Sequence, residues 1–586
     1  MRLLLEQTAR MVAETRGLDA LAAESDWLTR LDWRFTSDAE VCVEFNIVVQ
    51  SKVYEAILIY PNLFPQAPAY VRPRKADEVW SAHQYPGTGT LCLEWGPDTW
   101  HPDVTGADLI RSTYSLLTFE KIGPTYGISA PSRHETTLGQ QLRATIRRFV
   151  VLPQLTAAVV QAGSAPKTPL TVATSSRFLE LVSVATRLGG DEGPTLEGLP
   201  PELANPFIGG TFTRTGWMVR CDEWASLSSP AKSQSEIRAF LQGKECWPWA
   251  DDEDRCGFLL LVDDNRNLRP IALGTGEGEG DTAYEYSVID CSIDKVDRQP
   301  EQYRGLADKR VAIIGLGSVG SKIAVSLARS GVTRFLLIDD DILQPNNLSR
   351  NQLDWLSVGY DKVDGVRGAI RMVRADAEIQ TRTFRFAGQE SSASNTTMLE
   401  QIAACDLVID ATANSKVFSS AAAICTRRNI SLIWGEVFAG GIGALMARSI
   451  PGIDAEPLIV RAAINEYLAT LPEAPHKHAE GYDVEADNQV LIAGDAEVSH
   501  LAASLTQFAI DAIIPNETRR FPVAAYLLGY QRAWIFESPF DTRAIQCPSA
   551  PCEPQEAENT AAHTADLQEL LAAFGTNTHA DSKRPT

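Results

Sequence analysis

A glycine-rich turn between an expected strand and an expected helix constrains the fold of this 586-residue chain more than any other feature. Residues 311–314 read Val-Ala-Ile-Ile, a short buried strand, and the Gly-Leu-Gly-Ser-Val-Gly motif of residues 315–320 follows at once. The spacing of Gly315, Gly317 and Gly320 permits a tight turn that approaches phosphate groups at the N-terminus of the next helix. Further strand-like runs at 335–338 and 407–409 predict a doubly wound α/β domain.

The residues after the second of these strands indicate which nucleotide the turn favours. Alone, the glycine motif is most typical of NAD or FAD binding, but here the strand ends in three aspartates at 339–341. The chain then continues through Asn347-Leu348-Ser349-Arg350. A dinucleotide oxidoreductase needs one acid for its ribose hydroxyls and has no use for this cluster. A nicotinamide-dependent oxidoreductase therefore remains only a minor alternative.

This ordered series resembles the ThiF/MoeB and ubiquitin-activating adenylation family, which implies a Rossmann-like domain that binds ATP. The resemblance implies that Asp339 holds the ATP ribose and that Asn347 and Arg350 bind the phosphates. It also implies that Lys362 neutralises the triphosphate as pyrophosphate leaves, and that Asp341 lies near the phosphates and any metal. The chemistry agrees, because a carboxylate that attacks the α-phosphate brings two anions together. Cations must then be preorganised where charge builds up.

One departure from that family concerns the metal ion. The family usually carries Asp-x-Thr-Asp-Asn after its later strand, with the second acid on magnesium. This chain instead has Asp410 followed by Ala-Thr-Ala-Asn, so Ala413 stands at the metal position. Either Asp410 or Asp341 takes over the metal, or adenylation is impaired. We favour substitution by a neighbouring acid, and expect ATP and Mg²⁺ as cofactors.

The first 150 residues predict a separate α+β domain. Apolar and polar residues alternate at 41–49 with the period of a strand, and a second strand is expected at 54–60. A proline-spaced segment at 60–68 ends the pairing. Helical patterns follow at 109–117 and 138–149.

Cys92 is the candidate reaction centre of this domain. It lies in Gly-Thr-Leu-Cys-Leu-Glu-Trp at 89–95, followed by Trp-His-Pro at 100–102. With the proline segment, this frame resembles the ubiquitin-conjugating fold over about residues 30–120. The resemblance implies that Cys92 accepts an acyl group by transthiolation and passes it to an amine. The family's His-Pro-Asn signature is His83-Gln84-Tyr85 here, so we expect His83 or Tyr85 to donate the oxyanion hydrogen bond that the Asn supplies.

Two further cysteines lie beyond the predicted adenylation domain. Cys547 and Cys552 flank a Pro-Ser-Ala-Pro stretch, which suits a sulfur that travels to an adenylate. We rank Cys547 ahead of Cys552, with a partial metal site or an incidental pair as the alternatives. None of the ten cysteines forms a Cys-x-x-Cys pair, so no structural zinc is predicted.

Charge excludes one broad class of partner. The chain has 53 basic and 75 acidic side chains, a net charge of −22, which repels nucleic acid. No apolar run approaches the roughly 20 residues of a membrane helix. The charged residues Glu6, Arg10 and Glu14 follow the short apolar run of residues 3–5, so we expect no signal peptide and a cytoplasmic protein that does not bind membranes.

We therefore predict a multidomain α+β and α/β chain. Its expected parts are a ubiquitin-conjugating-like domain at 1–150, a mixed linker domain at 151–304, a ThiF-type adenylation domain at 305–545 and a mobile tail at 546–586. The order of the two enzyme-like halves resembles the bacterial conjugating–activating fusion family of CBASS anti-phage operons. That resemblance implies a homodimer, and a cGAS-like CD-NTase activated at its C-terminal glycine and joined to an unknown amine.

Two other functions stay open at this point. The same chemistry would suit a dedicated ubiquitin-like modifier from another bacterial operon. The other open function is that of a non-catalytic scaffold. Ala413 stands in place of the adenylation family's magnesium-binding aspartate, and Tyr85 in place of the conjugating family's asparagine.

Overall fold

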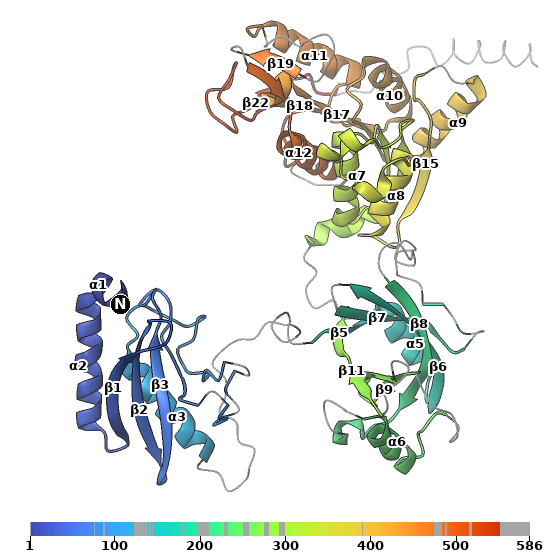
Figure 1. Cartoon of the computed structure of the whole chain (residues 1–586). Coiled ribbons are helices and arrows are strands. Elements are labelled where there is room, and N and C mark those ends of the chain that lie inside the picture. The colour runs from blue at the N-terminus through green and yellow to red at the C-terminus, as the bar shows by residue number, and fades with distance from the viewer. Residues whose placement is uncertain are drawn as a thin grey trace, which may run out of the picture. The chain divides into compact units, whose positions relative to one another are not determined.

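The computed structural model describes most of the chain in two compact units, Met1–Ala144 and Thr145–Thr586. The described residues are 2–75, 77–81, 83–85, 88–121, 139, 142, 145–177, 180–190, 193, 195–196, 210–227, 233–249, 257–274, 281–291, 299–388, 391–473, 483–486, 489–514 and 519–550. Figure 1 shows the elements of each unit. Among the described helices, none combines the length and apolar character needed to cross a bilayer.

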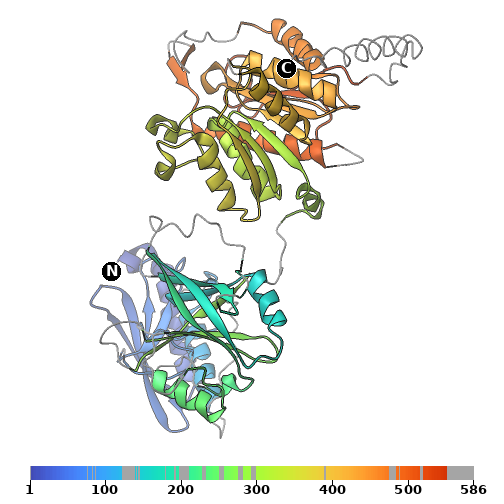
Figure 2. The same cartoon turned by 90° about the vertical axis from the view of Figure 1, so that its right-hand side faces the viewer.

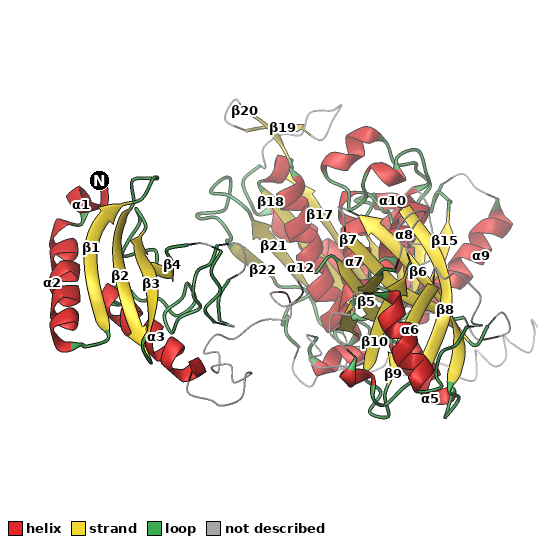
Figure 3. Ribbon diagram, turned by 60° about the horizontal axis from the view of Figure 1, so that its bottom comes forward, coloured by secondary structure: helices red, strands yellow, loops and turns green. Residues whose placement is uncertain are grey.

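The first unit is an antiparallel four-stranded meander with helices on one face (Figure 3). Its strands are β1 (Leu28–Phe35), β2 (Val41–Val49), β3 (Lys52–Tyr60) and β4 (Tyr70–Pro73), and its helices are α1 (Arg2–Glu6), α2 (Thr8–Glu24) and α3 (Gly106–Lys121). Alternate residues of β2 pack with α2 and α3 in one core, as the period-2 pattern predicts. The buried Glu14 carboxylate accepts hydrogen bonds from the Tyr60 hydroxyl and the Gly106 amide, and so ties α2 to β3 and α3.

The second unit begins with a curled sheet in the order β11-β10-β9-β8-β6-β7-β5-β12 (Figures 1 and 2). Its strands are β5 (Arg147–Val151), β6 (Lys167–Arg177), β7 (Glu180–Leu188), β8 (Gly210–Arg220), β9 (Gly257–Val262), β10 (Leu268–Leu273), β11 (Ala283–Glu285) and β12 (Ser287–Asp290). The two ends of this order, β11 and β12, are separated only by Tyr286, so the sheet closes on itself. Helix α5 (Pro153–Gln161) packs on one face and α6 (Gln234–Gly243) on the other.

Two predictions from the sequence concern the first strand of this sheet, β5. The helical pattern expected at 138–149 is wrong at its end, because Phe149 is a buried residue of β5 and pairs with β7 and β12. The expected domain boundary at 150 falls inside the same strand.

The rest of the second unit is a mixed sheet in the order β15-β14-β13-β16-β17-β18-β21-β22. The first five strands are parallel, namely β15 (Glu378–Arg382), β14 (Arg334–Ile338), β13 (Arg310–Ile314), β16 (Leu407–Asp410) and β17 (Ser431–Phe438). Antiparallel strands β18 (Gly443–Ser449), β21 (Ala525–Gly529) and β22 (Thr542–Ile545) extend it.

Helices cover both faces of this sheet. One face packs on α7 (Ser318–Ser330), α8 (Lys362–Arg371) and α12 (Asp495–Ile513), and the other on α9 (Ser392–Ala403), α10 (Ser415–Arg428) and α11 (Pro457–Ala469). Val311 and Ile313 of β13 face the first layer, whereas Ala312 and Ile314 face the second. The predicted doubly wound α/β fold is therefore confirmed.

Short strands and 3₁₀ turns complete the described part of the second unit. The strands β19 (Asp483–Ala486) and β20 (Gln489–Ile492) form a separate antiparallel pair. Short 3₁₀ turns lie at Trp224–Ser226, Glu301–Leu306, Pro345–Ser349, Trp355–Ser357 and Ala439–Gly441.

Candidate active site

The carboxyl ends of β13, β14 and β16 open into a cavity of about 700 Å³. Parallel strands bring their carboxyl ends to one edge of a sheet, where ligands of open α/β folds bind. Gly315 and Asp339 line this cavity together, although 24 residues separate them in the chain. Its other walls are Ile314, Ile338, Asp340, Phe384, Arg385, Phe386, Ala387, Gly388, Thr412, Ala413, Asn414, Ser415, Lys416 and Val417.

The three motif glycines are needed for different reasons. Gly315 has φ +86°, and a Cβ there would lie 2.7 Å from Cγ2 of Thr412. A Cβ on Gly320 would lie 1.9 Å from the Gly315 carbonyl oxygen, so the helix packs against its own turn. Around Gly317, by contrast, a Cβ would meet no described atom within 4 Å. Packing thus accounts for Gly315 and Gly320, and Gly317 leaves open space where α7 begins.

The Asp339 carboxylate stabilises the glycine turn and the segment after β14 through two hydrogen bonds from backbone amides. Its Oδ2 accepts a hydrogen bond of 2.5 Å from the Leu316 amide, and its Oδ1 accepts one of 2.9 Å from the Asp341 amide. Burial raises the pKa of this carboxyl, and these two hydrogen bonds act in the opposite direction. A carboxylate can accept about four hydrogen bonds, so the two oxygens keep capacity for ribose hydroxyls.

Asp341 and Lys362 form an ion pair at the start of α8. Lys362 is only 7% exposed, and its backbone amide also donates to the Asp341 carbonyl. The Lys362 ammonium lowers the pKa of the Asp341 carboxyl. Neither side chain lines the large cavity, so the structure places this pair beside the site and not on its wall.

The loop that carries Asn347 and Arg350 is tied to the glycine turn by a residue that the sequence patterns did not single out. Buried Asn351 donates from Nδ2 to the Leu316 carbonyl at 3.2 Å. Asn347 accepts a hydrogen bond from the Gln344 amide, and Arg350 donates to the Ala493 carbonyl at 3.1 Å. The loop is therefore preorganised next to the turn.

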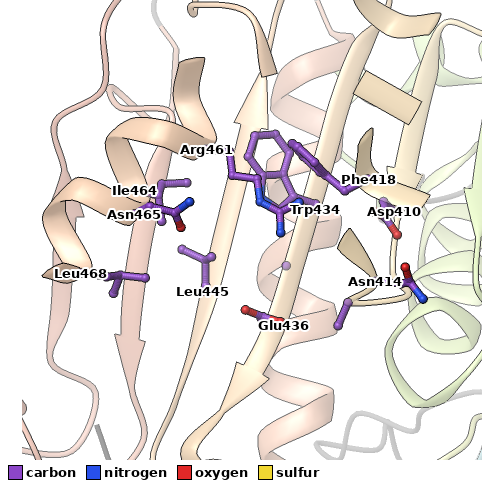
Figure 4. Close-up of a pocket in the computed structure, with 12 residues that line it drawn as sticks. Asp410, Asn414, Phe418, Trp434, Glu436, Leu445, Arg461, Ile464, Asn465 and Leu468 are labelled. Atoms are coloured by element: carbon purple, nitrogen blue, oxygen red, sulfur yellow. The ribbon is translucent and has the colours of Figure 1, made fainter. Parts of the chain in front are cut away.

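A second cavity of about 90 Å³ shares two lining residues, Ala413 and Asn414, with the first. Figure 4 shows the residues that line this second cavity. Asp410 lines this smaller cavity, and its Oδ1 accepts both hydrogen bonds from Thr412, at 3.0 Å from the amide and 2.6 Å from the hydroxyl. Burial raises the pKa of the Asp410 carboxyl. Arg461 of α11 lies in the same wall, and no sequence signal links it to Asp410, 51 positions earlier.

The described residues contain no group of three His, Cys, Asp or Glu side chains arranged to hold a metal. Magnesium in nucleotide sites needs only one or two carboxylates besides the phosphates. Asp341 follows β14 and Asp410 ends β16, and β13 lies between these two strands in the sheet. The two expected ligands have different partners, Lys362 for Asp341 and Thr412 for Asp410.

Cys92 lies in the first unit on a hairpin-like loop. Its amide donates to the His83 carbonyl at 2.7 Å, and the Tyr85 amide donates to the Thr90 carbonyl at 2.8 Å. Burial raises the pKa of the half-buried thiol, and a hydrogen bond with the Tyr85 side chain partly offsets that rise. Of the two expected oxyanion donors, the structure thus brings the Tyr85 side chain to the sulfur.

The Gln84 side chain orders this loop through its hydrogen bonds. Its role was not predicted from the sequence, because the resemblance to His-Pro-Asn pointed only to the neighbours His83 and Tyr85. Its Nε2 donates to the carbonyls of Glu78 and Gly89, at 2.8 and 3.0 Å, and its Oε1 accepts from the Trp80 amide at 2.8 Å. Beside the loop is a cavity of about 580 Å³, whose walls include Tyr85, Cys92, Tyr70, Arg72 and Trp95.

Cys547 follows β22 in a segment that is held against the sheet. The Ala455 amide donates to the Pro548 carbonyl and the Ala550 amide to the Ile453 carbonyl, at 3.1 and 3.0 Å. Burial, with the nearby Asp454 charge, raises the pKa of the Cys547 thiol to about 11. The predicted mobile tail is thus ordered at 547–550, and Cys552 lies outside the described residues.

This pKa predicts a steep pH dependence for Cys547. With a pKa of about 11, only about one thiol in ten thousand is ionised at pH 7, and that fraction rises tenfold per pH unit. We expect alkylation of Cys547 by iodoacetamide to accelerate about a hundredfold between pH 7 and pH 9, as measured by peptide mass spectrometry. A rate that is already maximal at pH 7 would show that the segment leaves its hydrophobic contacts in solution.

Comparison with known proteins places the adenylation-type region in a family. Residues 294–456 match the ThiF family. The ATP-dependent ubiquitin transferase-like protein Cap2 of Enterobacter hormaechei subsp. hoffmannii (strain UCI 50) is 34% identical over 132 residues, 22% of this chain and 21% of that protein. Ubiquitin-like modifier-activating enzyme 5 of Drosophila simulans is 27% identical over 176 residues, 28% of this chain and 44% of that protein.

Solved structures of similar fold include PaaA, at 18% identity and a TM-score of 0.32, covering 42% of this chain and 75% of PaaA. E. coli MccB with ATP has 17% identity and a TM-score of 0.32, covering 42% of this chain and 67% of MccB. The matched segments span about a fifth of Cap2 and less than half of the activating enzyme. Residues 294–456 of this chain therefore match the ThiF family, and a segment of 132 residues is similar to part of the ubiquitin transferase-like protein Cap2.

Proposed function

We propose that this chain uses ATP to activate the C-terminal carboxylate of a partner protein and conjugates it to an amine. The observation that carries the proposal is the glycine turn at the N-terminus of α7, which leaves open space at its N-cap Gly317, together with the cavity of about 700 Å³ that Gly315 and Asp339 line. Backbone amides at a helix N-terminus bind phosphate, and a carboxylate at the end of the next strand suits a ribose. The ThiF family match supports adenylation over hydride transfer.

In the first step a donor carboxylate oxygen attacks the α-phosphorus of ATP. A new C–O–P linkage forms, the bond from the α-phosphorus to the bridging oxygen breaks, and pyrophosphate leaves. Asp339 would hold the ribose, and Asn347, Arg350 and Lys362 would bind the phosphates. The Asp341 carboxylate holds the nearly buried Lys362 ammonium in place. The ammonium is therefore preorganised to meet the phosphate charge.

Magnesium would bind through Asp410 or Asp341 together with the phosphates, and would supply charge neutralisation there. Asp341 keeps a half-exposed carboxylate, and both Thr412 hydrogen bonds to Asp410 go to one oxygen, which leaves Oδ2 for another ligand. The Ala413 side chain carries no carboxylate, so magnesium binding in this chain would depend on Asp341 and Asp410.

The acyl group would next pass to sulfur. A thiolate of Cys547 or Cys552 attacks the acyl carbonyl and AMP leaves, and the Cys92 thiolate then displaces that sulfur. A target amine finally attacks the Cys92 thioester, releasing the thiolate. Tyr85 supports this role for Cys92, because its side chain shares a hydrogen bond with the sulfur and can donate to the developing oxyanion. His83 contributes through its backbone carbonyl, which orders the Cys92 amide.

We propose a CD-NTase as the donor, in anti-phage defence, because the order of the two enzyme-like halves resembles the conjugating–activating fusion family of CBASS operons. The similarity of one segment to the ATP-dependent ubiquitin transferase-like protein Cap2 supports this choice. We also propose a cytoplasmic homodimer that pairs through the adenylation domain. A reducing compartment suits a relay of free thiols, and all eight cysteines among the described residues are free.

A non-catalytic scaffold is the second candidate, favoured by Ala413 and by the raised pKa values of Cys92 and Cys547. To distinguish the two, the chain is incubated with ATP and the CD-NTase, and adducts are resolved with and without reductant. We expect a reductant-sensitive adduct that is absent from a Cys92→Ala, Cys547→Ala, Cys552→Ala triple variant. An adduct that persists in the triple variant defeats the thiol relay, and mass spectrometry identifies any ubiquitin-like modifier acting as donor instead.

A further inference from the structure

Two helices, α9 and α10, form most of the walls of a cavity of about 560 Å³ that the steps above do not use. The residues that α10 contributes recur at the i, i+4, i+7, i+8 and i+11 spacing of one helix face. They are Lys416, Ser420, Ala423, Ile424 and Arg427. From α9 come Asn395 and Leu399, which also lie on one face because they are four residues apart. Since a helix rises about 1.5 Å per residue, the α10 wall is about 16 Å long.

The deep part of this cavity is apolar and the two ends of its α10 wall are basic. Leu399 and Ile424 are half-buried and pack against the core beneath the two helices, and Ala423 adds a short exposed side chain. Lys416 lies in the first turn of α10 and Arg427 in the last, and both are exposed. Among the described residues of the wall, none is acidic. The cavity therefore suits an amphipathic helix that carries acidic residues.

One segment of this chain has that pattern in its sequence. Residues 564–575 lie outside the described residues and read Thr-Ala-Asp-Leu-Gln-Glu-Leu-Leu-Ala-Ala-Phe-Gly. Their large apolar side chains have the i, i+3, i+4, i+7 spacing by which helices enter grooves: Leu567, Leu570, Leu571 and Phe574. Thr564 before this run and Gly575 after it are typical of the two ends of a helix. Residues 551–575 contain five acidic side chains and no Lys or Arg, so their charge is complementary to that of the cavity.

The chain between the last described residue and this segment is long enough to reach the cavity. The described part ends at Ala550, whose amide donates to the Ile453 carbonyl shortly before α11 begins. Helix α11 lies next to α10, where the Arg461 guanidinium stacks on the Phe418 ring. The 13 residues from 551 to 563 can extend to about 45 Å, whereas a helix with its side chains is about 10–12 Å wide. The segment can therefore pass α11 and α10 and reach the cavity.

We propose that residues 564–575 form a helix that docks in the cavity between α9 and α10 of the same chain. The apolar side of this helix covers the half-buried residues of the wall, and acidic residues within and before it lie near Lys416 and Arg427. A helix of this length is marginal in water on its own, so docking supplies its stability. Docking also leaves only residues 551–563 as free chain, and so limits how far Cys552 can travel.

Hydrogen exchange on the full chain, followed by mass spectrometry, tests the docking without ATP or a donor. Amides of residues 566–574 should exchange at least about tenfold more slowly in the chain than in a synthetic peptide of residues 560–578, because the isolated helix opens readily. This protection should be the same over an about tenfold range of protein concentration, since helix and cavity belong to one chain. Protection that rises with concentration would assign the cavity to the tail of a second copy and overturn the proposal.

A variant of the cavity tests where the helix docks. Ala423→Glu places a charge in the middle of the α10 wall and should bring exchange of residues 566–574 to within about twofold of the free peptide. Glutamate is a good helix former, so α10 itself should stay folded. Thr426→Glu is the matched control, because Thr426 is an exposed residue of α10 outside the cavity wall, and it should keep the wild-type protection.

A pair of variants in the tail makes the same comparison without touching the described fold. Leu571→Glu interrupts the apolar side of the expected helix and should lose the protection, whereas Ala572→Glu falls on the opposite side and should keep it. Exchange at the peptide's rate in the wild-type chain overturns the proposal. Protection that is lost in Leu571→Glu but kept in Ala423→Glu also overturns it, because the helix would then dock elsewhere.

Discussion

Replacing Lys362 with alanine should slow donor-dependent ATP–pyrophosphate exchange by about 10²–10³-fold. The ammonium is nearly buried and is positioned by Asp341, so it meets developing phosphate charge without reorganisation. Loss of one such preorganised group typically costs about 3–4 kcal/mol of transition-state stabilisation. The exchange rate is measured with radiolabelled pyrophosphate and the CD-NTase as donor.

Lys309→Ala is the control for this variant, because Lys309 lies in the same domain and pairs with Asp406 at the surface. It should exchange at the wild-type rate. The Lys362 variant leaves Asp341 half exposed, so its melting temperature should change little. A Lys362→Ala variant that folds and exchanges normally would remove this lysine from the reaction.

Cys92→Ala should abolish transfer to the target amine and leave ATP–pyrophosphate exchange within twofold of wild type. In the proposed relay, adenylation takes place in the ThiF-type region, whereas the final thioester needs the Cys92 sulfur. The loss is expected to be complete within detection, since alanine offers no nucleophile. Conjugates are quantified on reducing gels, where only amide-linked product remains.

Two further variants test whether the effect is specific to Cys92 and how Tyr85 acts on its thiol. Cys291→Ser removes an exposed thiol of the second unit and should conjugate normally. Tyr85→Phe removes a hydrogen bond that lowers the pKa of Cys92, so the thiol pKa should rise and alkylation at pH 8 should slow by about tenfold. Amide-linked product from Cys92→Ala at the wild-type rate would show that Cys92 is not the transferring residue.

The doubly wound sheet and its glycine turn were predictable because local pattern and tertiary structure agree there. Val311 to Ile314 is buried on both faces, as its unbroken apolar run indicates. A Cβ on Gly315 would meet the Thr412 side chain, and a Cβ on Gly320 would meet the Gly315 carbonyl oxygen. In the first unit, the alternation along 41–49 likewise predicted the face that packs on α2 and α3.

The remaining features depend on contacts between distant segments. The curled sheet of 147–290 closes because β12 pairs with β5, and no local motif carries that information. Phe149 was expected to be helical, yet pairing with β7 overrides its local pattern. Arg461 lies on α11, which carries no recognised motif, and Asn351 directly follows the recognised Asn347–Arg350 stretch but makes a contact with the glycine turn that spacing does not reveal. The ordering of Cys547 follows from backbone pairing with 453–455.

Calorimetric titration of the full chain with ATP and, separately, with NADH tests most directly whether the turn at 315–320 serves adenylation. We expect saturable ATP binding that weakens at least tenfold in Gly317→Val, whose side chain enters the open space beside the turn, and no binding of NADH. Tight binding of NADH together with no heat from ATP would contradict an adenylating site and leave the cysteines without an activated acyl group to receive.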